Sequence, residues 1–297
     1  MRFRTPRDRH SWRKGFALPK QSQVILKLYD IRGREVATLV DESYGLLGIV
    51  YEVTFKVKPL ELVAVKHRNY SLDDFVKQFP RLIERQESIM LYLYPFLNKV
   101  TVEFLRYSDH TRSPNRLVWK IRNFFFRNGA GGFGSLVTRF VPFKPIRYFL
   151  LDVFNRSFQV GLRWIIRSTH TMPADQIVRY PKKAGMGKYV FSFWAFPKEN
   201  YPEVLKAYYA FCREHDQSRS YRNNMSSVGY RIIQDTNNLF SYSSEGQVVT
   251  IDPVSTGGPR WDEFLDAFNE FSVQRGGRPA FQPDPQADAE SGQKSHW

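Results

Sequence analysis

The chain has 297 residues, 42% hydrophobic and 25% charged, a balance that is ordinary for a globular protein. A chain of this length can bury a sizeable core, in one large domain or two small ones. Its formal net charge of +15 suggests nucleic acid or an anionic membrane as a partner. Beyond the basic first twenty residues, however, the charges are scattered among acidic and hydrophobic residues. No zinc-finger or recognition-helix pattern accompanies them, so no specific nucleic acid is expected.

Other bulk features narrow the class of protein further. Cys212 is the only cysteine, which excludes an intrachain disulfide, and its apolar helical setting predicts a small core residue. The six histidines do not fall at metal-ligand spacing, so no metal site is expected. No run of about 18 uncharged apolar residues predicts a transmembrane segment. The amino terminus has no apolar core typical of a signal peptide, and a cytoplasmic protein is expected.

The first part of the chain combines a basic tail with short strands. Residues 1–22 are basic and lack apolar periodicity, which predicts a disordered tail. Two strand-like runs, Val24–Tyr29 and Glu35–Val40, flank a group of turn residues and predict a β-hairpin within residues 23–42.

A glycine-punctuated turn, Ser43–Gly48, then leads into the alternating strand pattern of Ile49–Val57. Glycines allow backbone amides to approach a ligand closely, as a bound cofactor requires. An ordinary tight turn before a strand explains the same residues, and the residues alone favour that explanation.

Beyond residue 60, strand and helix patterns follow each other without a strict βαβ rhythm, which predicts an α+β fold. Further strands are expected at 62–67, 89–94, 100–107, 189–196, 228–233, 239–242 and 248–251. Helices are expected from Ser71 to about Glu84 with a possible kink at Pro80, through most of 115–166, and along the aromatic stripes of 201–212 and 261–271. We predict one antiparallel sheet with flanking helices that includes the strands near 49–57, 89–94, 100–107 and 189–196. The polar composition of residues 279–297 predicts a second disordered tail.

Residues 128–134 are rich in glycine and contain a possible nucleotide-binding motif. Gly129–Gly134 matches the GxGxxG spacing of dinucleotide-binding proteins. That motif requires a strand before it and a helix after it, so that the helix amino terminus meets the pyrophosphate. The preceding residues have a helical pattern, which favours a flexible glycine loop over residues 128–134.

A second polar stretch is a candidate for substrate binding. Tyr221, Arg222 and Asn223 precede the strand-like run that carries Tyr230 and Arg231. Hydroxyl and guanidinium groups on adjacent strands can orient a polyol or a carboxylate. A solvated strand edge is an equally good explanation of the same residues.

The segment Tyr44–Phe55, continuing to Lys58-Pro59-Leu60, resembles the end of the FAD-binding domain in flavoproteins of the vanillyl-alcohol-oxidase (PCMH-type) family. Downstream segments, Met186–Phe196, Gly229–Arg231 and Ile251–Gly257, resemble FAD-linked oxidases related to sugar-lactone oxidases. The resemblance covers about residues 43–278. It implies that residues 43–60 are the remnant of an FAD-binding domain and that residues 61–278 form the cap, or substrate, domain.

The resemblance also implies an activity and a set of site residues. The activity is oxidation of an alcohol or sugar-lactone-type small molecule by hydride transfer to FAD. Tyr230, Arg231 and Arg222 would face the substrate, and the cofactor contacts would come from Gly45, Gly48, Ile49 and Val50.

Three departures from the family qualify this assignment. The long amino-terminal FAD domain of the family is not present in this sequence, which suggests a truncated chain. Val24–Glu42 resembles instead the β-rich sorting domain of type IX secretion cargo. The terminal His-Trp-Gly-Lys motif of sugar-lactone oxidases is also missing. The alternative is a non-catalytic cap-domain remnant that binds a protein or an anionic polymer through its basic surface.

Overall fold

The computed structural model describes residues 26–29, 35–38, 50–53, 62–85, 87–108, 116–125, 129–165, 170–173, 190–236, 241–257 and 260–279. The chain forms two compact units, residues 1–60 and 61–297. The expected tails 1–22 and 279–297 lie outside the described residues except for Pro279, which belongs to a strand (Arg278–Pro279) and not to a tail.

The first unit contains a small antiparallel sheet in the order β2–β1–β3, formed by Leu26–Tyr29 (β1), Glu35–Thr38 (β2) and Val50–Val53 (β3). The pairing of β1 with β2 confirms the expected hairpin. The placement of the strand near 49–57 in the large sheet was wrong, because β3 pairs with β1. Alternation in a sequence identifies a strand but does not say which strand it pairs with.

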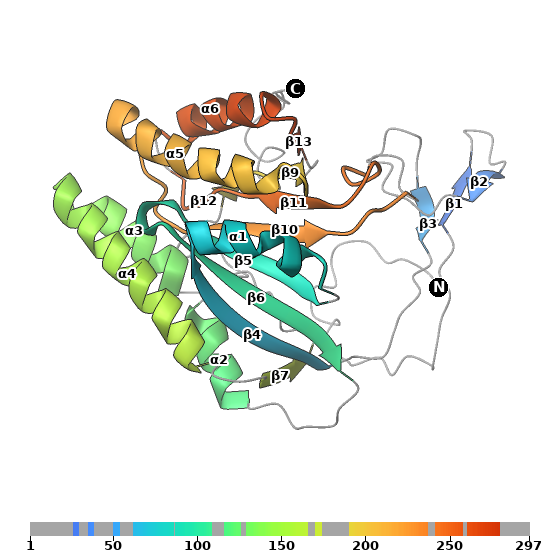
Figure 1. Ribbon diagram of the computed structural model, residues 1–297, viewed down its shortest axis with the longest axis horizontal. Helices are drawn as coiled ribbons and strands as arrows, with labels where there is room; N and C mark the ends of the chain where they lie inside the picture. The colour runs from blue at the N-terminus through green and yellow to red at the C-terminus, as the bar shows by residue number, and fades with distance from the viewer. Residues whose placement is uncertain are drawn as a thin grey trace, which may run out of the picture. The chain divides into compact units, whose positions relative to one another are not determined.

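The second unit is built on an eight-stranded sheet in the order β13–β9–β11–β10–β5–β6–β4–β7 (Figure 1). Every pairing in it is antiparallel, which confirms the predicted α+β class. In chain order the strands are Leu62–Ser71 (β4), Ser88–Tyr94 (β5), Lys99–Ser108 (β6), His170–Pro173 (β7), Trp194–Pro197 (β9), Ser227–Ile232 (β10), Val248–Ile251 (β11) and Arg278–Pro279 (β13). Val190–Phe191 (β8) and Val254–Ser255 (β12) pair separately.

Six α-helices and one 3₁₀ helix are described in this unit. They are Leu72–Ile83 (α1), Pro95–Leu97 (η1, 3₁₀), Arg116–Phe124 (α2), Ala130–Phe140 (α3), Lys144–Ile165 (α4), Tyr201–Arg219 (α5) and Trp261–Val273 (α6). The amino terminus of α1 is capped by Ser71, whose Oγ accepts a hydrogen bond from the backbone N–H of Asp74 at 3.1 Å. Pro80 lies inside α1 without ending it. Gly276, with a φ of 68°, follows α6 in the left-handed conformation that glycine adopts readily.

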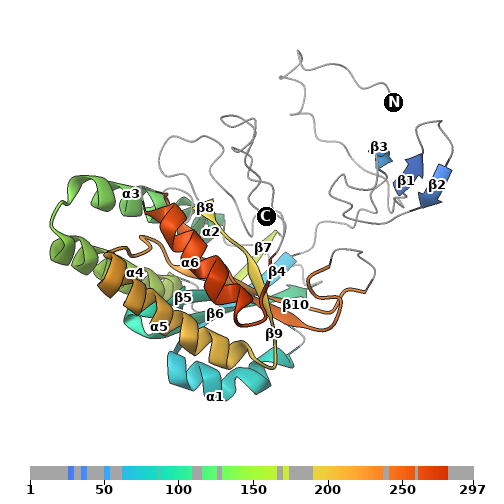
Figure 2. The same ribbon diagram turned by 90° about the horizontal axis from the view of Figure 1, so that it is seen from above.

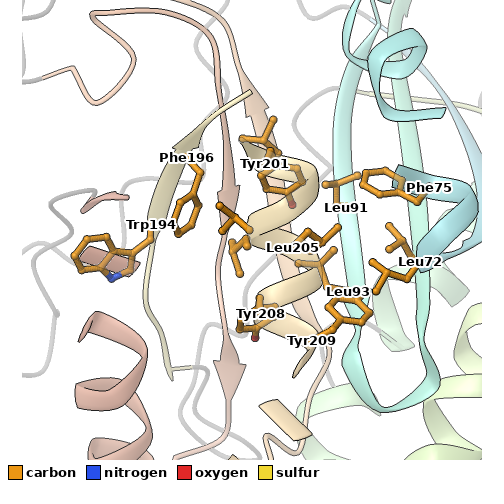
Figure 3. Packing of buried hydrophobic residues seen from close by; sticks show 14 of the residues in the cluster. Leu72, Phe75, Leu91, Leu93, Trp194, Phe196, Tyr201, Leu205, Tyr208 and Tyr209 are labelled. Atoms are coloured by element: carbon orange, nitrogen blue, oxygen red, sulfur yellow. The ribbon is translucent and has the colours of Figure 1, made fainter. Parts of the chain in front are cut away.

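The main core lies between one face of the sheet, here called the first face, and helices α1, α5 and α6 (Figures 1 and 2). Alternate residues of β5 and β6 supply the sheet side, and the aromatic stripe of α5 supplies much of the helix side (Figure 3). Tyr201, Tyr208 and Tyr209 have no exposed surface, and Cys212 is a buried core residue as expected. Burial of several large aromatic rings at about 25 cal/mol per Å² is the main force that fixes these helices on the sheet.

Three local expectations are corrected. The predicted glycine loop 128–134 is helical from Ala130 onward, as the first turn of α3. The single strand expected at 189–196 is interrupted, and its two halves, β8 and β9, belong to different sheets. In the strand expected at 239–242, the described residues 241 and 242 are not in a strand. In each case the local composition predicted a different conformation from the one observed, because contacts with residues far apart in the sequence can override local preference.

Candidate functional site

A buried carboxylate lies on the opposite side of the sheet, here called the second face. Because strand side chains alternate, residues 90, 92 and 94 of β5 and residues 101 and 103 of β6 point away from the first-face core. The register pairs Glu103 of β6 with His67 of β4, and the side chains of both residues have no exposed surface. The fold therefore places an acid and a base side by side in the interior.

Three donors converge on one oxygen of this carboxylate. His67 Nε2 lies 2.5 Å from Glu103 Oε2, and the guanidinium of Arg122, from α2, donates to the same oxygen at 3.0 Å. The hydroxyl of Tyr92 donates to it at 3.2 Å. An ionised carboxylate only accepts hydrogen bonds, so the His67 Nε2–H is the donor in that pair. These contacts are charge-assisted and therefore stronger than neutral hydrogen bonds.

The electrostatics of the cluster keep the carboxylate charged. Burial alone would raise the pKa of Glu103, but the charge of Arg122 and the contact with His67 outweigh it and lower that pKa to about 2. Burial and the nearby Glu103 charge raise the pKa of Tyr92 well above its usual value, so this hydroxyl remains a proton donor. Burial lowers the pKa of Arg122, but the charge of Glu103 more than offsets this, and the net shift is upward.

The cluster keeps unused hydrogen-bonding capacity. Within the described part of the chain, Glu103 Oε1 and His67 Nδ1 are buried and have no hydrogen-bond partner. Most buried polar atoms in proteins are paired, because leaving one unpaired costs about 1–3 kcal/mol. Because the pKa of Glu103 is held at about 2, this carboxylate is a weak base, and the two unpaired atoms offer hydrogen-bonding capacity and not a proton acceptor.

Tyr230, a residue expected to face the substrate, belongs to the same face as this cluster. The register pairs Tyr230 with Met90, Met90 with Glu103, and Glu103 with His67, so one row crosses four strands from β10 to β4. Tyr230 is only partly buried and packs against Met90, Tyr92 and Tyr94. It therefore links the partly exposed part of the second face to the buried cluster.

Arg231 points to the opposite face of the sheet. Its guanidinium donates to the backbone carbonyls of Ile83 at 2.8 Å, of Glu87 at 2.5 Å, and of Arg85. These carbonyls lie at the carboxyl end of α1 and just beyond it, where the helix leaves its last carbonyls without internal partners. The geometry gives Arg231 a structural role, because neighbouring residues of a strand point to opposite faces.

Arg222 also has a separate set of neighbours. It forms an ion pair with Asp152 of α4, and its guanidinium lies 3.8 Å from the ring centre of Phe96 in η1. Its side chain is 5% exposed. It also lines a pocket together with Tyr94, Tyr221 and other residues of this region. Arg222 therefore ties α4 to η1, and the three expected substrate residues do not form one cluster.

The structure describes only one of the four residues expected to contact the cofactor. Gly45, Gly48 and Ile49 lie outside the described residues, and Val50 begins β3 in the first unit. The GxGxxG stretch does not form a phosphate cradle: a Cβ at Gly134 would come 2.9 Å from the backbone oxygen of Asn224, so the glycine serves packing. The space beside Gly134 is therefore filled by Asn224 and is not open to a phosphate.

His67, Tyr92, Glu103 and Arg122 were not identified from the sequence. One signal was present, because Glu103 is the single acidic residue of the expected strand 100–107. Such a charge requires a partner. The partners come from β4, β5 and α2, however, and only the strand register identifies them.

Comparison with known proteins identifies solved structures with a similar fold but assigns the chain to no family. No protein-family profile matches the chain, and no curated protein matches its sequence. Among solved structures, a solvent-stable cholesterol oxidase matches with a TM-score of 0.51 and 13% identity, over 84% of this chain and 54% of that protein. This chain shares its fold with part of an oxidase. It spans about half the length of that cholesterol oxidase.

A second solved structure is more distant. The berberine bridge enzyme from Eschscholzia californica matches with a TM-score of 0.34 and 10% identity, over 80% of this chain and 45% of that enzyme. None of these matches supports the resemblance of residues 24–42 to a secretion sorting domain. Among the helices that the structure describes, none is long and apolar enough to cross a membrane.

Proposed function

We propose that residues 61–278 form the substrate-binding part of an FAD-dependent oxidoreductase that acts on an alcohol or a sugar-lactone-type substrate. The observation that carries this proposal is the row of second-face side chains that runs from the partly exposed Tyr230 to the buried, ionised Glu103. The fold likeness to a cholesterol oxidase and the resemblance of residues 43–60 to the end of a flavin domain support the same activity.

Different residues of the second face have different roles in binding the substrate. Tyr230, partly exposed, is positioned to donate a hydrogen bond to the substrate oxygen. The buried, ionised Glu103, held by Arg122 and His67, accepts a hydrogen bond from Tyr92 and fixes the second face beside Tyr230. FAD, when bound, supplies the hydride acceptor. The contribution of residues 61–278 is to bind and orient the substrate.

Flavin spectroscopy on the full chain tests this function. FAD is titrated into the protein and the visible absorbance is followed, and a panel of sterol, sugar and lactone alcohols is then added without oxygen. The expected result is a perturbed flavin spectrum that bleaches with at least one alcohol class. A spectrum that stays identical to that of free FAD at millimolar FAD would refute the proposal.

Matched tyrosine variants test the assignment of Tyr230. Tyr230→Phe removes one hydrogen bond, worth about 1 kcal/mol, and should slow bleaching or weaken alcohol binding by roughly fivefold. Tyr107→Phe, at a tyrosine that is 55% exposed on β6, is the control and should change neither. Equal behaviour of the two variants would remove Tyr230 from the site.

A further inference from the structure

Exposed apolar side chains gather on three helices of the second unit. Fourteen large hydrophobic residues are exposed among the described residues, and eleven of them lie between residues 117 and 160. The eleven are Leu117, Ile121, Phe124, Phe125, Leu136, Phe140, Phe143, Ile146, Phe149, Val153 and Val160. We call them, with the helices α2, α3 and α4 that carry them, the α2–α4 surface. Helices α2 and α3 both contact α4, so these exposed apolar side chains lie on adjoining elements and mark a candidate interaction site.

Helical periodicity shows that α4 has an apolar face on each of two sides. Its inward side packs Phe154 against Phe133 of α3, with ring centres 4.4 Å apart, and buries Leu151. Its exposed side carries Ile146, Val153 and Val160 at intervals of seven residues, which places them in one stripe. A helix that needed only to pack on this protein would carry polar residues on the exposed side.

The turn between α3 and α4 is the most exposed part of this surface. Residues 138–140 and 142–146 are all exposed, and Phe140 and Phe143 keep 67% of their surface each. Both views place this turn at the outer end of the helix pair, away from the sheet (Figures 1 and 2). Phe140 and Phe143 therefore lie at an exposed turn, here called the tip, at the end of the α3–α4 helix pair.

The charges around these side chains are of one sign. Residues 116–165 contain nine lysines and arginines and a single acidic residue, Asp152, which is paired with Arg222. Lys120, Arg139, Lys144 and Arg156 are exposed among the apolar side chains. Arg139 and Lys144 flank the tip directly. The surface thus combines exposed aromatic rings with positive charge and offers no exposed acid to a basic partner.

We propose that the α2–α4 surface docks on an anionic phospholipid bilayer, with Phe140 and Phe143 inserted at the level of the headgroups. A bilayer interface accepts apolar side chains and attracts basic ones in the same contact. A nucleic acid or another polyanion would pair with the lysine and arginine side chains but would leave the eleven apolar side chains in water. A protein partner would have to offer a pocket for two exposed rings together with an acidic rim. The contact is peripheral, since no described helix can cross a membrane.

Vesicle flotation of the full chain tests the docking. Two vesicle types are compared, phosphatidylcholine alone and phosphatidylcholine mixed with phosphatidylserine. We expect the protein to float with the anionic vesicles, to float poorly with the neutral ones, and to be released as salt is raised. FAD is absent throughout, so the outcome does not depend on the proposed oxidase function.

Two double variants separate the apolar and the electrostatic contributions. Phe140→Ser with Phe143→Ser, and Arg139→Glu with Lys144→Glu, should each weaken binding to anionic vesicles at least about tenfold. The matched controls are Ile233→Ser, at an apolar residue 69% exposed, and Lys206→Glu, at an exposed lysine of α5. Both controls should bind as the wild type does, and thermal melting of every variant confirms that the fold is retained.

Several outcomes would overturn the proposal. Failure of the wild type to float with anionic vesicles at low salt is the most direct. Serine variants that bind vesicles as well as the wild type would show that the apolar tip does not take part. A dimer that the serine variants dissociate, with no vesicle binding by any form, would assign the surface to a second copy of the chain.

Discussion

At the scale of single residues, the buried cluster around Glu103 is where one substitution should matter most. Glu103→Ala leaves Arg122, whose side chain is 3% exposed, as a buried charge without its carboxylate partner. Loss of one partner from a buried ion pair costs about 3–5 kcal/mol. Urea unfolding should show a loss of this size, whereas Glu199→Ala, at a side chain that is 66% exposed, should change stability by less than about 0.5 kcal/mol. Equal losses in the two variants would contradict the buried-pair account.

The same residue predicts how stability depends on pH. The pKa of Glu103 is lowered to about 2 in the folded protein, below the value near 4.3 expected when the chain is unfolded. A lowered folded-state pKa gives stability that is fully present above the unfolded value and is lost as the pH falls through the folded one. Unfolding measured between about pH 6 and pH 1 should therefore show a loss that begins near pH 5 and approaches roughly 3 kcal/mol below about pH 2. Glu103→Gln should remove this component of the acid loss, and Glu199→Gln should keep it.

At the scale of the elements, two glycines of α3 should respond to alanine in opposite directions. A Cβ at Gly134 would meet the backbone oxygen of Asn224 at 2.9 Å, whereas a Cβ at Gly132 meets nothing within 4 Å. Gly134→Ala should lose about 1–3 kcal/mol of stability by overpacking. Gly132→Ala should gain up to about 1 kcal/mol, because alanine is the better helix former. Chemical unfolding of the two variants checks both signs, and a stabilising Gly134→Ala would show that α3 does not pack on Asn224.

This pair of glycines also shows what sequence can and cannot predict about the elements. The helices at 201–219 and 261–273 were predictable, because their aromatic residues repeat with the helical period. The helix over residues 130–140 was not, because its Gly134 is required by contact with the distant residue Asn224 and does not mark a loop. Strand positions in the large sheet were mostly predictable from alternation, but the row that joins Tyr230 to Glu103 depends on a register between strands far apart in the sequence.

At the scale of the whole molecule, the two surfaces of the second unit are independent of each other. The row of Tyr230, Glu103 and His67 crosses the central strands of the sheet, and the exposed apolar residues lie on the outward faces of α2 and α4 and at the α3–α4 tip. Tyr230→Phe should leave vesicle binding unchanged, and the serine variants of the tip should leave the flavin spectrum unchanged. Flotation and flavin absorbance measured on the same samples distinguish the two, and parallel loss of both in either variant would indicate general unfolding.

The strength of FAD binding is a property of the whole chain. The described residues supply a wall for the substrate side, the space beside Gly134 is not open to a phosphate, and the chain spans about half the length of the cholesterol oxidase that it resembles in fold. The amide contacts expected from Gly45 and Gly48 would then bear the entropic cost of ordering a large flexible ligand almost alone. The affinity for FAD should be no tighter than the high micromolar range, about −5 to −6 kcal/mol.

The variant Gly48→Val should abolish FAD binding, because a β-branched side chain blocks close backbone approach, and Gly132→Ala should bind FAD as the wild type does. Titration followed by flavin fluorescence measures all three proteins. Nanomolar binding, or a Gly48→Val variant that binds normally, would place the cofactor contacts elsewhere in the chain.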